Sequence, residues 1–418
     1  MIGIKSYLKK KTARLLIPYI SPNKFPQKPL SKLQSWAIIR NFEKELKLFS
    51  NAVGKGSLLV KPNSIAVKTW QKLLPYIANN LGNWSTGEQD PFNLTTKLEQ
   101  EIINKMTDLL AYNRKNVEGY ITSGATEGNI FSAWIGRHYL QTYSNLNKIC
   151  LLSNVLTHYS VRKAADIVGL PNYLLPVNER NWNTDVLSLV KILEKLFKKG
   201  YRGFLIPLTL GYTVGGKNDD ITGIIKKVRL FKKLHPATHF FIWIDAALSG
   251  LMLPFISESF LPFEYPEIST LVTDFHKFPG VPYPAGLILY RNNYRQYIEK
   301  KIPYLNTKDN TLLGSRTGLA AASIWNTLHS YAYMGFNKEA TKCLARKNDF
   351  ISKLYNTFPG INIITDDKSP AAAIIVKKKL PESFCLKHDL EMIKYNINFV
   401  RTTKTVKLYK LFFLPEYA

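Results

Sequence analysis

The sequence predicts an α/β protein, with a mostly parallel sheet in a large domain and a smaller α+β domain after it. Three observations support this prediction. Short apolar runs alternate with segments of helical spacing over residues 91–300, which is the order of a doubly wound sheet. These runs lack polar–apolar alternation, as strands buried on both faces do. After residue 300 the spacing changes, so we expect a separate small domain over 301–418.

The individual segments support this order. Residues 1–90 are rich in Pro, Lys and Asn and are expected to wrap around the core and a partner subunit. In 185–200 the apolar residues fall at helical spacing, lysines follow in the last turn and Gly200 ends the helix. Strands are expected at 118–124, 148–154, 203–211, 239–248, 269–275, 285–291, 361–367, 371–379 and 406–417. Helices are expected at 129–143, 157–170, 185–200 and 316–335.

The chain is unusually basic, with 57 Lys and Arg against 30 Asp and Glu and a formal net charge of +27. This balance favours polyanions, but no specific nucleic acid is predicted because the basic residues are not gathered with aromatics beyond the N-terminal arm. The three cysteines are far apart, which predicts no metal site and fits a reduced, cytoplasmic compartment. No uncharged apolar run reaches the length of a membrane-spanning helix.

The N-terminal arm, residues 1–42, carries nine Lys and Arg and no acidic residue. Its sequence allows three interpretations. It packs on a neighbouring segment or subunit, it contacts an anionic membrane surface or another polyanion as a basic amphipathic helix, or it is a targeting segment.

Four places could share one site, because each follows an expected strand. The turn at 122–129 exposes N–H groups before a helix and could seat a phosphate, or it is a plain capped turn. His158 could stack on a ring, or it only begins a helix. Asp245 ends an apolar run and could pair with a protonated heterocycle, or it caps a helix. Lys277 lies among aromatics and could be a reactive amine, or it extends into solvent.

Taken together, these places match the requirements of pyridoxal phosphate. A lysine forms a Schiff base with this cofactor, and an aspartate keeps its pyridine nitrogen protonated so that the ring accepts electrons. A turn before a helix holds the phosphate, and a histidine can stack on the ring. The chain order of the four places on one predicted sheet therefore favours this cofactor over four unrelated explanations.

At this point the motifs resemble a known family. "YITSGATEGN", "THYSVRKAA", "LGYTVGGKNDDI", "DAALSGLMLPF", "HKFPGVPYPAGLIL" and "LLGSRTGLAA" are similar, in the same order, to motifs of the group II pyridoxal-phosphate decarboxylases. The similarity is closest to the histidine decarboxylase branch and covers roughly residues 80–335. It implies the aspartate-aminotransferase-like fold (fold type I) and a homodimer with active sites at the interface.

The resemblance also implies roles for individual residues. Lys277 would carry the internal aldimine, Asp245 would pair with the pyridine nitrogen, and Tyr304 would return a proton to the substrate carbon. The remaining assignments concern the ring and the phosphate. Ala247 and His158 would pack on the two ring faces, Ser123, Gly124, Ala125, Thr126 and His276 would hold the phosphate, and Ser315, in the segment Gly314–Ser315–Arg316, would reach the partner's phosphate.

The implied reaction is decarboxylation of an L-amino acid, histidine or another aromatic or polar one, through an external aldimine and a quinonoid. Two alternatives remain. A carbon–carbon lyase acting on a phosphorylated amino alcohol would fit the Asp-x-His-Lys pattern at 274–277, which sphingosine-phosphate lyases share. A non-catalytic protein of the same fold could use the positive charge to bind a polyanion.

Three positions depart from the histidine decarboxylase branch. Asp274-Phe275 stands where that branch has Ser-Gly, and an aspartate pointing at a phosphate would repel it. Tyr212 replaces a threonine and could reshape the pocket. Lys61 lies where relatives have residues of the substrate entrance, where it could meet an acidic group or simply be solvated.

Overall fold

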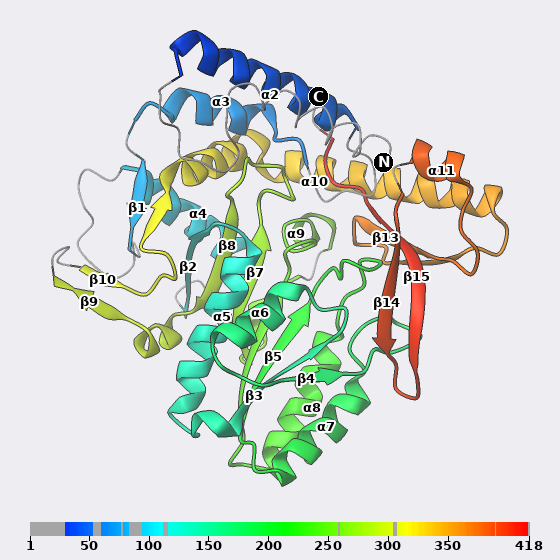
Figure 1. The fold of residues 1–418 in the computed structure, drawn as a ribbon. Helices are drawn as coiled ribbons and strands as arrows, with labels where there is room; N and C mark the ends of the chain where they lie inside the picture. Colours follow the sequence, from blue (N-terminus) through cyan, green and yellow to red (C-terminus); the bar gives the residue numbers. More distant parts are fainter. Residues whose placement is uncertain are drawn as a thin grey trace.

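The computed structural model describes residues 30–52, 60–76, 78–82, 94–111, 116–257, 260–303, 307–388 and 390–416. Its centre is a seven-stranded sheet with the order β2-β8-β7-β6-β5-β3-β4 (Figure 1). β8 is antiparallel to both of its neighbours, and the other pairs are parallel. The strands are β2 (Val117–Thr122), β3 (Ile149–Asn154), β4 (Asn172–Leu175), β5 (Gly203–Thr209), β6 (His239–Asp245), β7 (Ile268–Asp274) and β8 (Gly286–Arg291).

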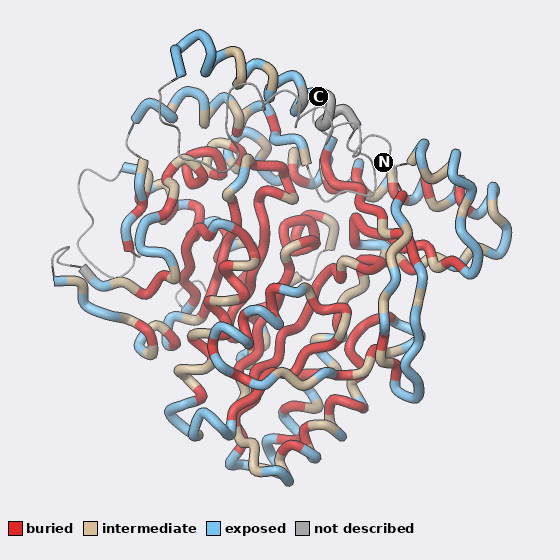
Figure 2. The backbone as a smooth tube through the Cα atoms, in the orientation of Figure 1, coloured by how far each residue is buried: buried red, intermediate tan, exposed pale blue. Residues whose placement is uncertain are grey.

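The apolar runs form strands covered on both faces. Every residue of β2, β3, β5 and β7 is buried, as the absence of polar–apolar alternation predicts. Successive residues of β6 alternate between two core clusters, with Phe241 and Trp243 in one and Ile242 and Ile244 in the other. Figure 2 shows the central strands buried along their length.

Helices flank this sheet. They are α4 (Leu94–Leu110), α5 (Ala125–Gln141), α6 (Tyr159–Ile167), α7 (Val186–Lys198), α8 (Ile221–Leu234) and the short α9 (Leu253–Ile256). Asp185 and Asp220 cap α7 and α8, because each carboxylate accepts a hydrogen bond from a backbone N–H three residues on. The helix expected at 129–143 begins four residues earlier, at Ala125, so half of the expected turn is the first turn of α5.

The C-terminal part contains an antiparallel sheet of order β12-β13-β15-β14. Its strands are β12 (Asn362–Thr365), β13 (Ala371–Ile375), β14 (Met392–Asn398) and β15 (Thr403–Phe412), and α11 (Glu382–Lys387) lies between β13 and β14 in the chain. The long α10 (Gly318–Thr357) runs from the large unit to this sheet and is kinked at Ala332. Phe350 and Leu354 of its second half pack against Ile374 and Leu411 of the small sheet.

The N-terminal helices α2 (Lys32–Ala52) and α3 (Ser64–Leu73) lie over α10 and α4 at one end of the molecule (Figure 1). Two further strand pairs lie at the edge, β1 (Asn79–Leu81) with β11 (Ser315–Thr317) and β9 (Lys300–Ile302) with β10 (Thr307–Asp309). Among the described residues, no helix is long and apolar enough to cross a membrane. The expected domain limits at 90 and 300 stay predictions.

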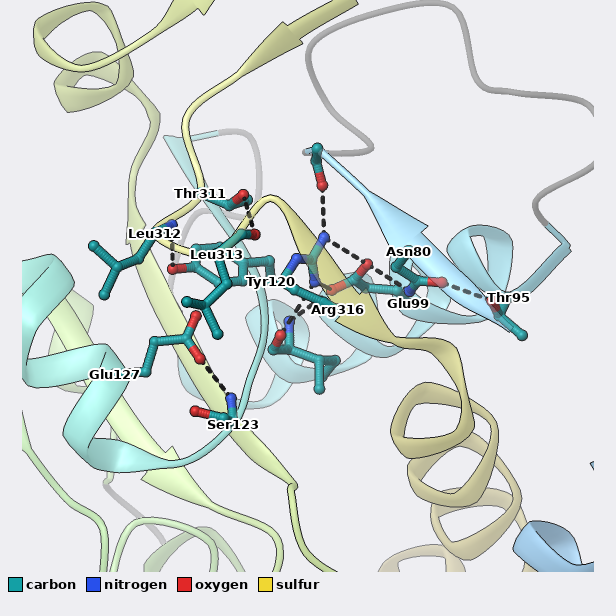
Figure 3. Close-up of polar contacts among 12 residues, drawn as sticks. Asn80, Thr95, Glu99, Tyr120, Ser123, Glu127, Thr311, Leu312, Leu313 and Arg316 are labelled. Atoms are coloured by element: carbon teal, nitrogen blue, oxygen red, sulfur yellow. Dashed lines mark hydrogen bonds and ion pairs between the residues drawn. The ribbon is translucent and has the colours of Figure 1, made fainter. Parts of the chain in front are cut away.

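A buried ion pair joins these edge elements to the central sheet (Figure 3). Glu99 of α4 accepts hydrogen bonds from Arg316 of β11, from the Asn80 side chain of β1 and from the Ile121 N–H of β2. The Arg316 guanidinium also donates to the Gly82 carbonyl and lies 4.9 Å from the centre of the Tyr120 ring. Because the partners of Glu99 lie in β1, β2 and β11, this pair positions β2, the strand that leads into the expected phosphate turn.

Removing one member of this pair should destabilise the fold. Glu99→Ala leaves a buried guanidinium without its carboxylate, and we expect the free energy of unfolding to fall by about 3–5 kcal/mol. Asp349→Ala breaks an exposed pair with Lys353 on α10 and should cost less than about 1 kcal/mol. Urea denaturation followed by circular dichroism measures both. Equal losses for the two variants would contradict the proposed role of the buried pair.

Candidate active site

A cavity of about 340 Å³ opens at the carboxyl ends of β5, β6 and β7, next to the N-terminus of α5. This is where ligands of open α/β sheets bind. Nine of the expected residues line it: Ser123, Gly124, Ala125, Thr126, His158, Asp245, Ala247, His276 and Lys277. Ser315 is exposed on β11 and does not line it, so its contact with a partner's phosphate stays a prediction. Tyr304 lies outside the described residues.

The turn between β2 and α5 depends on a glycine. Gly124 has φ 156°, and a Cβ built there would lie 3.3 Å from Cε1 of His276. Two N–H groups of the turn already have carboxylate acceptors in the chain. The Ser123 N–H donates to Glu127 Oε2 at 2.7 Å (Figure 3), and the Ala125 N–H donates to Asp274 Oδ1 at 2.7 Å.

Lys277 follows β7 and enters the cavity from the other side. Its Nζ lies 3.0 Å from Asp274 Oδ2, and its side chain is only 16% exposed. Phe275 and Phe278 are buried in the core, so the aromatic neighbours seen in the sequence anchor the lysine loop. His276 Nδ1 lies 3.1 Å from the Ala285 carbonyl. Burial lowers the pKa of His276, which favours its neutral form with the proton on Nδ1.

Asp245 ends β6 at the opposite wall of the cavity. Its Oδ2 accepts a hydrogen bond from Asn129 Nδ2 at 2.8 Å, and its Oδ1 accepts from the Ala247 N–H at 3.2 Å. The Trp243 indole donates to Asn129 Oδ1 at 3.0 Å. Because an indole N–H can only donate, it fixes the orientation of the Asn129 amide, whose N–H groups must then face Asp245.

The same amide reaches His158. Asn129 Nδ2 donates to Ser160 Oγ at 2.9 Å, and Ser160 Oγ lies 2.7 Å from His158 Nδ1. The Ser160 N–H also donates to His158 Nδ1 at 3.4 Å, so Nδ1 is an acceptor and the histidine proton is on Nε2. Burial lowers the pKa of His158, in agreement with a neutral ring. His158 also caps α6, so the two interpretations of this residue are compatible.

The sequence did not reveal the role of Asn129, the last residue of the expected turn at 122–129. A polar side chain on the buried face of α5 could have indicated buried hydrogen bonds. The partners of Asn129 could not be predicted, because they depend on how α5 packs on β6 and α6. Tyr212 does not line the cavity. It is buried and donates to Asp219 Oδ2 at 2.8 Å, so it does not reshape the pocket.

The residues present fit pyridoxal phosphate. Thr209 Oγ1 is buried at the wall of the cavity and has no hydrogen-bond partner among the described residues, so an acceptor or donor of a ligand can reach it. The wall carries an aspartate, a lysine and a glycine turn at a helix N-terminus, which are the groups that the ring nitrogen, the aldehyde and the phosphate of this cofactor need.

We expect Asn129 to position Asp245 for the cofactor. Asn129→Asp keeps the shape but places a second carboxylate against Asp245 and removes both N–H donors. The dissociation constant of pyridoxal phosphate should rise at least about tenfold, which corresponds to about 1.4 kcal/mol. Equilibrium dialysis measures it. Ser132→Ala, a buried α5 residue whose hydroxyl donates to Gly128, is the control. Unchanged affinity in a folded Asn129→Asp protein would refute this role.

The pyridoxal-dependent decarboxylase conserved domain matches residues 73–377. The chain is 28% identical over 289 residues to the histidine decarboxylase of Vibrio campbellii, with 68% of this chain and 70% of that protein covered. It is 28% identical to the tryptophan decarboxylase of Clostridium sporogenes, with 71% of each covered.

Solved structures show the same fold. The L-methionine decarboxylase of Streptomyces sp. 590 superposes with a TM-score of 0.78 at 17% identity, covering 94% of this chain and 93% of that one. The sphingosine-1-phosphate lyase of Burkholderia pseudomallei superposes with a TM-score of 0.73 at 12% identity, covering 95% and 89%. The expected fold, cofactor and histidine-decarboxylase-like resemblance are confirmed. The chain therefore belongs to the pyridoxal-dependent decarboxylase family, as a carboxy-lyase that uses pyridoxal phosphate and acts on an amino acid.

Proposed function

We propose that this cavity decarboxylates an L-amino acid with an aromatic or polar side chain, with histidine as the first candidate. One observation supports this best. Lys277 and Asp245 line the same cavity from different strands, and each has a fixed partner, Asp274 and Asn129 respectively. Histidine and tryptophan decarboxylases are among the relatives, which agrees with a planar or polar side chain.

The cofactor, when bound, supplies the electron sink for the pair of electrons left by the departing carboxylate. The chain supplies the orientation. Lys277 would hold the cofactor through its amine, and Asp245, whose oxygens accept two N–H donors of the chain, would accept a hydrogen bond from the protonated pyridine nitrogen. Ala247 and His158 would pack on the two ring faces. Orientation in the cavity would then select which bond to the substrate carbon stands perpendicular to the ring plane and breaks.

The phosphate of the cofactor belongs at the start of α5 in this proposal. Ser123, Gly124, Ala125, Thr126 and His276, which line the cavity there, would hold it, and the helix dipole favours its negative charge. Ser315 of the partner would complete this shell. His276 is held by the Ala285 carbonyl, so its Nε2 faces Asp274 and the turn.

Return of a proton to the substrate carbon is proposed for His158 or Tyr304. The hydrogen bond from the Ser160 N–H leaves the His158 proton on Nε2, the ring atom available to a substrate.

A homodimer is part of the proposal. Helix α2 presents Leu33, Trp36 and Ile39 to solvent, with 75%, 63% and 53% of their surface exposed. Three large apolar residues on one helix are rarely left in water, and a second copy of the chain would cover them. Light scattering should give the dimer mass for the wild type and a lower mass for Trp36→Glu. A wild-type monomer would refute this part.

Two further expectations remain proposals. The basic arm at 1–42 is proposed to contact an anionic surface, although residues 1–29 lie outside the described residues. We place the enzyme in the cytoplasm because its cysteines are unpaired: two are buried, and the third is partly buried.

The substrate assignment is tested by offering the twenty amino acids and measuring amine and carbon dioxide by mass spectrometry. We expect one or a few aromatic or polar amino acids to yield both products in equal amounts. Lys277→Ala should lower the rate at least about a thousandfold, because the amine that carries the cofactor is lost. Lys338→Ala, which removes an exposed lysine of α10, should leave it unchanged.

Release of an aldehyde from a phosphorylated amino alcohol, without carbon dioxide from any amino acid, would favour the carbon–carbon lyase. Binding of RNA or anionic vesicles by a protein that takes up no cofactor would favour a non-catalytic role. Either outcome would overturn the proposal.

A further inference from the structure

We propose that Asp274 occupies the anion site that the cofactor phosphate needs, so that binding of the phosphate is coupled to the uptake of one proton. This inference rests on the proposed placement of the phosphate at the start of α5. It explains a departure from the histidine decarboxylase branch, which has a serine at this position. Proton uptake on cofactor binding would then depend on Asp274, although the decarboxylation reaction does not require it.

The Asp274 carboxylate lies among the donors of the phosphate turn. Its side chain is 3% exposed, and Oδ1 accepts from the Ala125 N–H at 2.7 Å, in the first turn of α5. Its Oδ2 lies 3.0 Å from Lys277 Nζ and 3.3 Å from His276 Nε2. A Cβ on Gly124 would lie 3.7 Å from Oδ1. A backbone N–H, a helix N-terminus and an ammonium therefore already serve one carboxylate, and the unprotonated Nε2 of His276 faces it as well.

This carboxylate cannot readily leave the turn. Asp274 is the last residue of β7, which pairs with β6 on one side and with β8 on the other, where Asp274 faces Gly286. Moving the side chain away would separate a buried charge from its donors, which costs several kcal/mol. A phosphate that enters the turn therefore meets a fixed carboxylate at close range.

A phosphate and a carboxylate held next to each other repel unless they share a proton. A phosphate monoester has a second pKa of about 6, so it is mostly a dianion at neutral pH. The titratable groups that face Asp274 are Lys277, His276, His158 and Tyr283. Burial lowers the pKa of both histidines and raises that of Tyr283, so these three groups stay neutral and only Lys277 opposes the negative charge. A proton between an Asp274 oxygen and a phosphate oxygen relieves the repulsion.

The experiment compares wild-type protein with Asp274→Asn, both freed of cofactor. Asparagine keeps an oxygen for the Ala125 N–H and presents an N–H₂ group to the turn. Pyridoxamine 5'-phosphate is the probe, because it carries the phosphate but no aldehyde and cannot react with Lys277. Calorimetry in buffers of different ionisation enthalpy gives the dissociation constant and the number of protons taken up. Pyridoxamine, which lacks the phosphate, is the control ligand.

At pH 8 the wild type should take up about one proton more per bound probe than Asp274→Asn. For each pH unit above 8, the affinity of the wild type for the probe should therefore fall about tenfold more than the affinity of Asp274→Asn does. Asp274→Asn should bind the probe at least about tenfold more tightly at pH 8. Pyridoxamine should bind both proteins equally. Asp274→Ser should behave like Asp274→Asn and replaces it if that variant does not fold.

Equal proton uptake and equal affinity in wild type and variant would overturn the inference while leaving the cofactor site intact. A difference that appears equally with pyridoxamine would also overturn it, because the effect would then not involve the phosphate. No binding of pyridoxamine 5'-phosphate to either protein would instead refute the placement of the cofactor in this cavity, and the inference with it.

Discussion

The side-chain amide of Asn129 is the contact on which the geometry of the site depends. It accepts from Trp243 of β6 and donates to Asp245 at the end of the same strand and to Ser160 of α6. One buried group thereby fixes how α5 lies on the sheet and where the Asp245 carboxylate points. Because the indole can only donate, the orientation of the Asn129 amide and the direction of both hydrogen bonds that it donates are determined.

A second contact sets the opposite wall. The hydrogen bond from Ala125 to Asp274 joins the start of α5 to the end of β7, although β2 and β7 are separated by β8 in the sheet. The turn between β2 and α5 and the loop that carries Lys277 are therefore both held by the carboxylate of Asp274. The buried pair of Glu99 and Arg316 fixes the strand before this turn, since Glu99 also accepts a hydrogen bond from the Ile121 N–H of β2. Rigidity of this kind is what orientation-controlled chemistry needs.

Much of the fold followed from the sequence, because strands covered on both faces must be apolar throughout. The carboxyl ends of such strands lie at one edge, so Asp245 and Lys277 could be placed in one site before any coordinates. The start of α5 could not be predicted well, because Ser, Thr and Gly serve equally in a turn and in a first helical turn. The contacts of Asn129, Asp274 and Glu99 join segments far apart in the chain, and no local pattern specifies them.

The central claim is that Lys277, rather than another lysine of this basic chain, carries the cofactor. The sharpest competitor is Lys347 of α10, a buried lysine whose pKa burial lowers to about 8 and whose Nζ donates to the carbonyls of Asp366 and Ser369. The holoenzyme is reduced with borohydride, digested and mapped by mass spectrometry. The account predicts a single pyridoxyl label on the peptide with Lys277. A label on Lys347, or labels spread over exposed lysines, would contradict it.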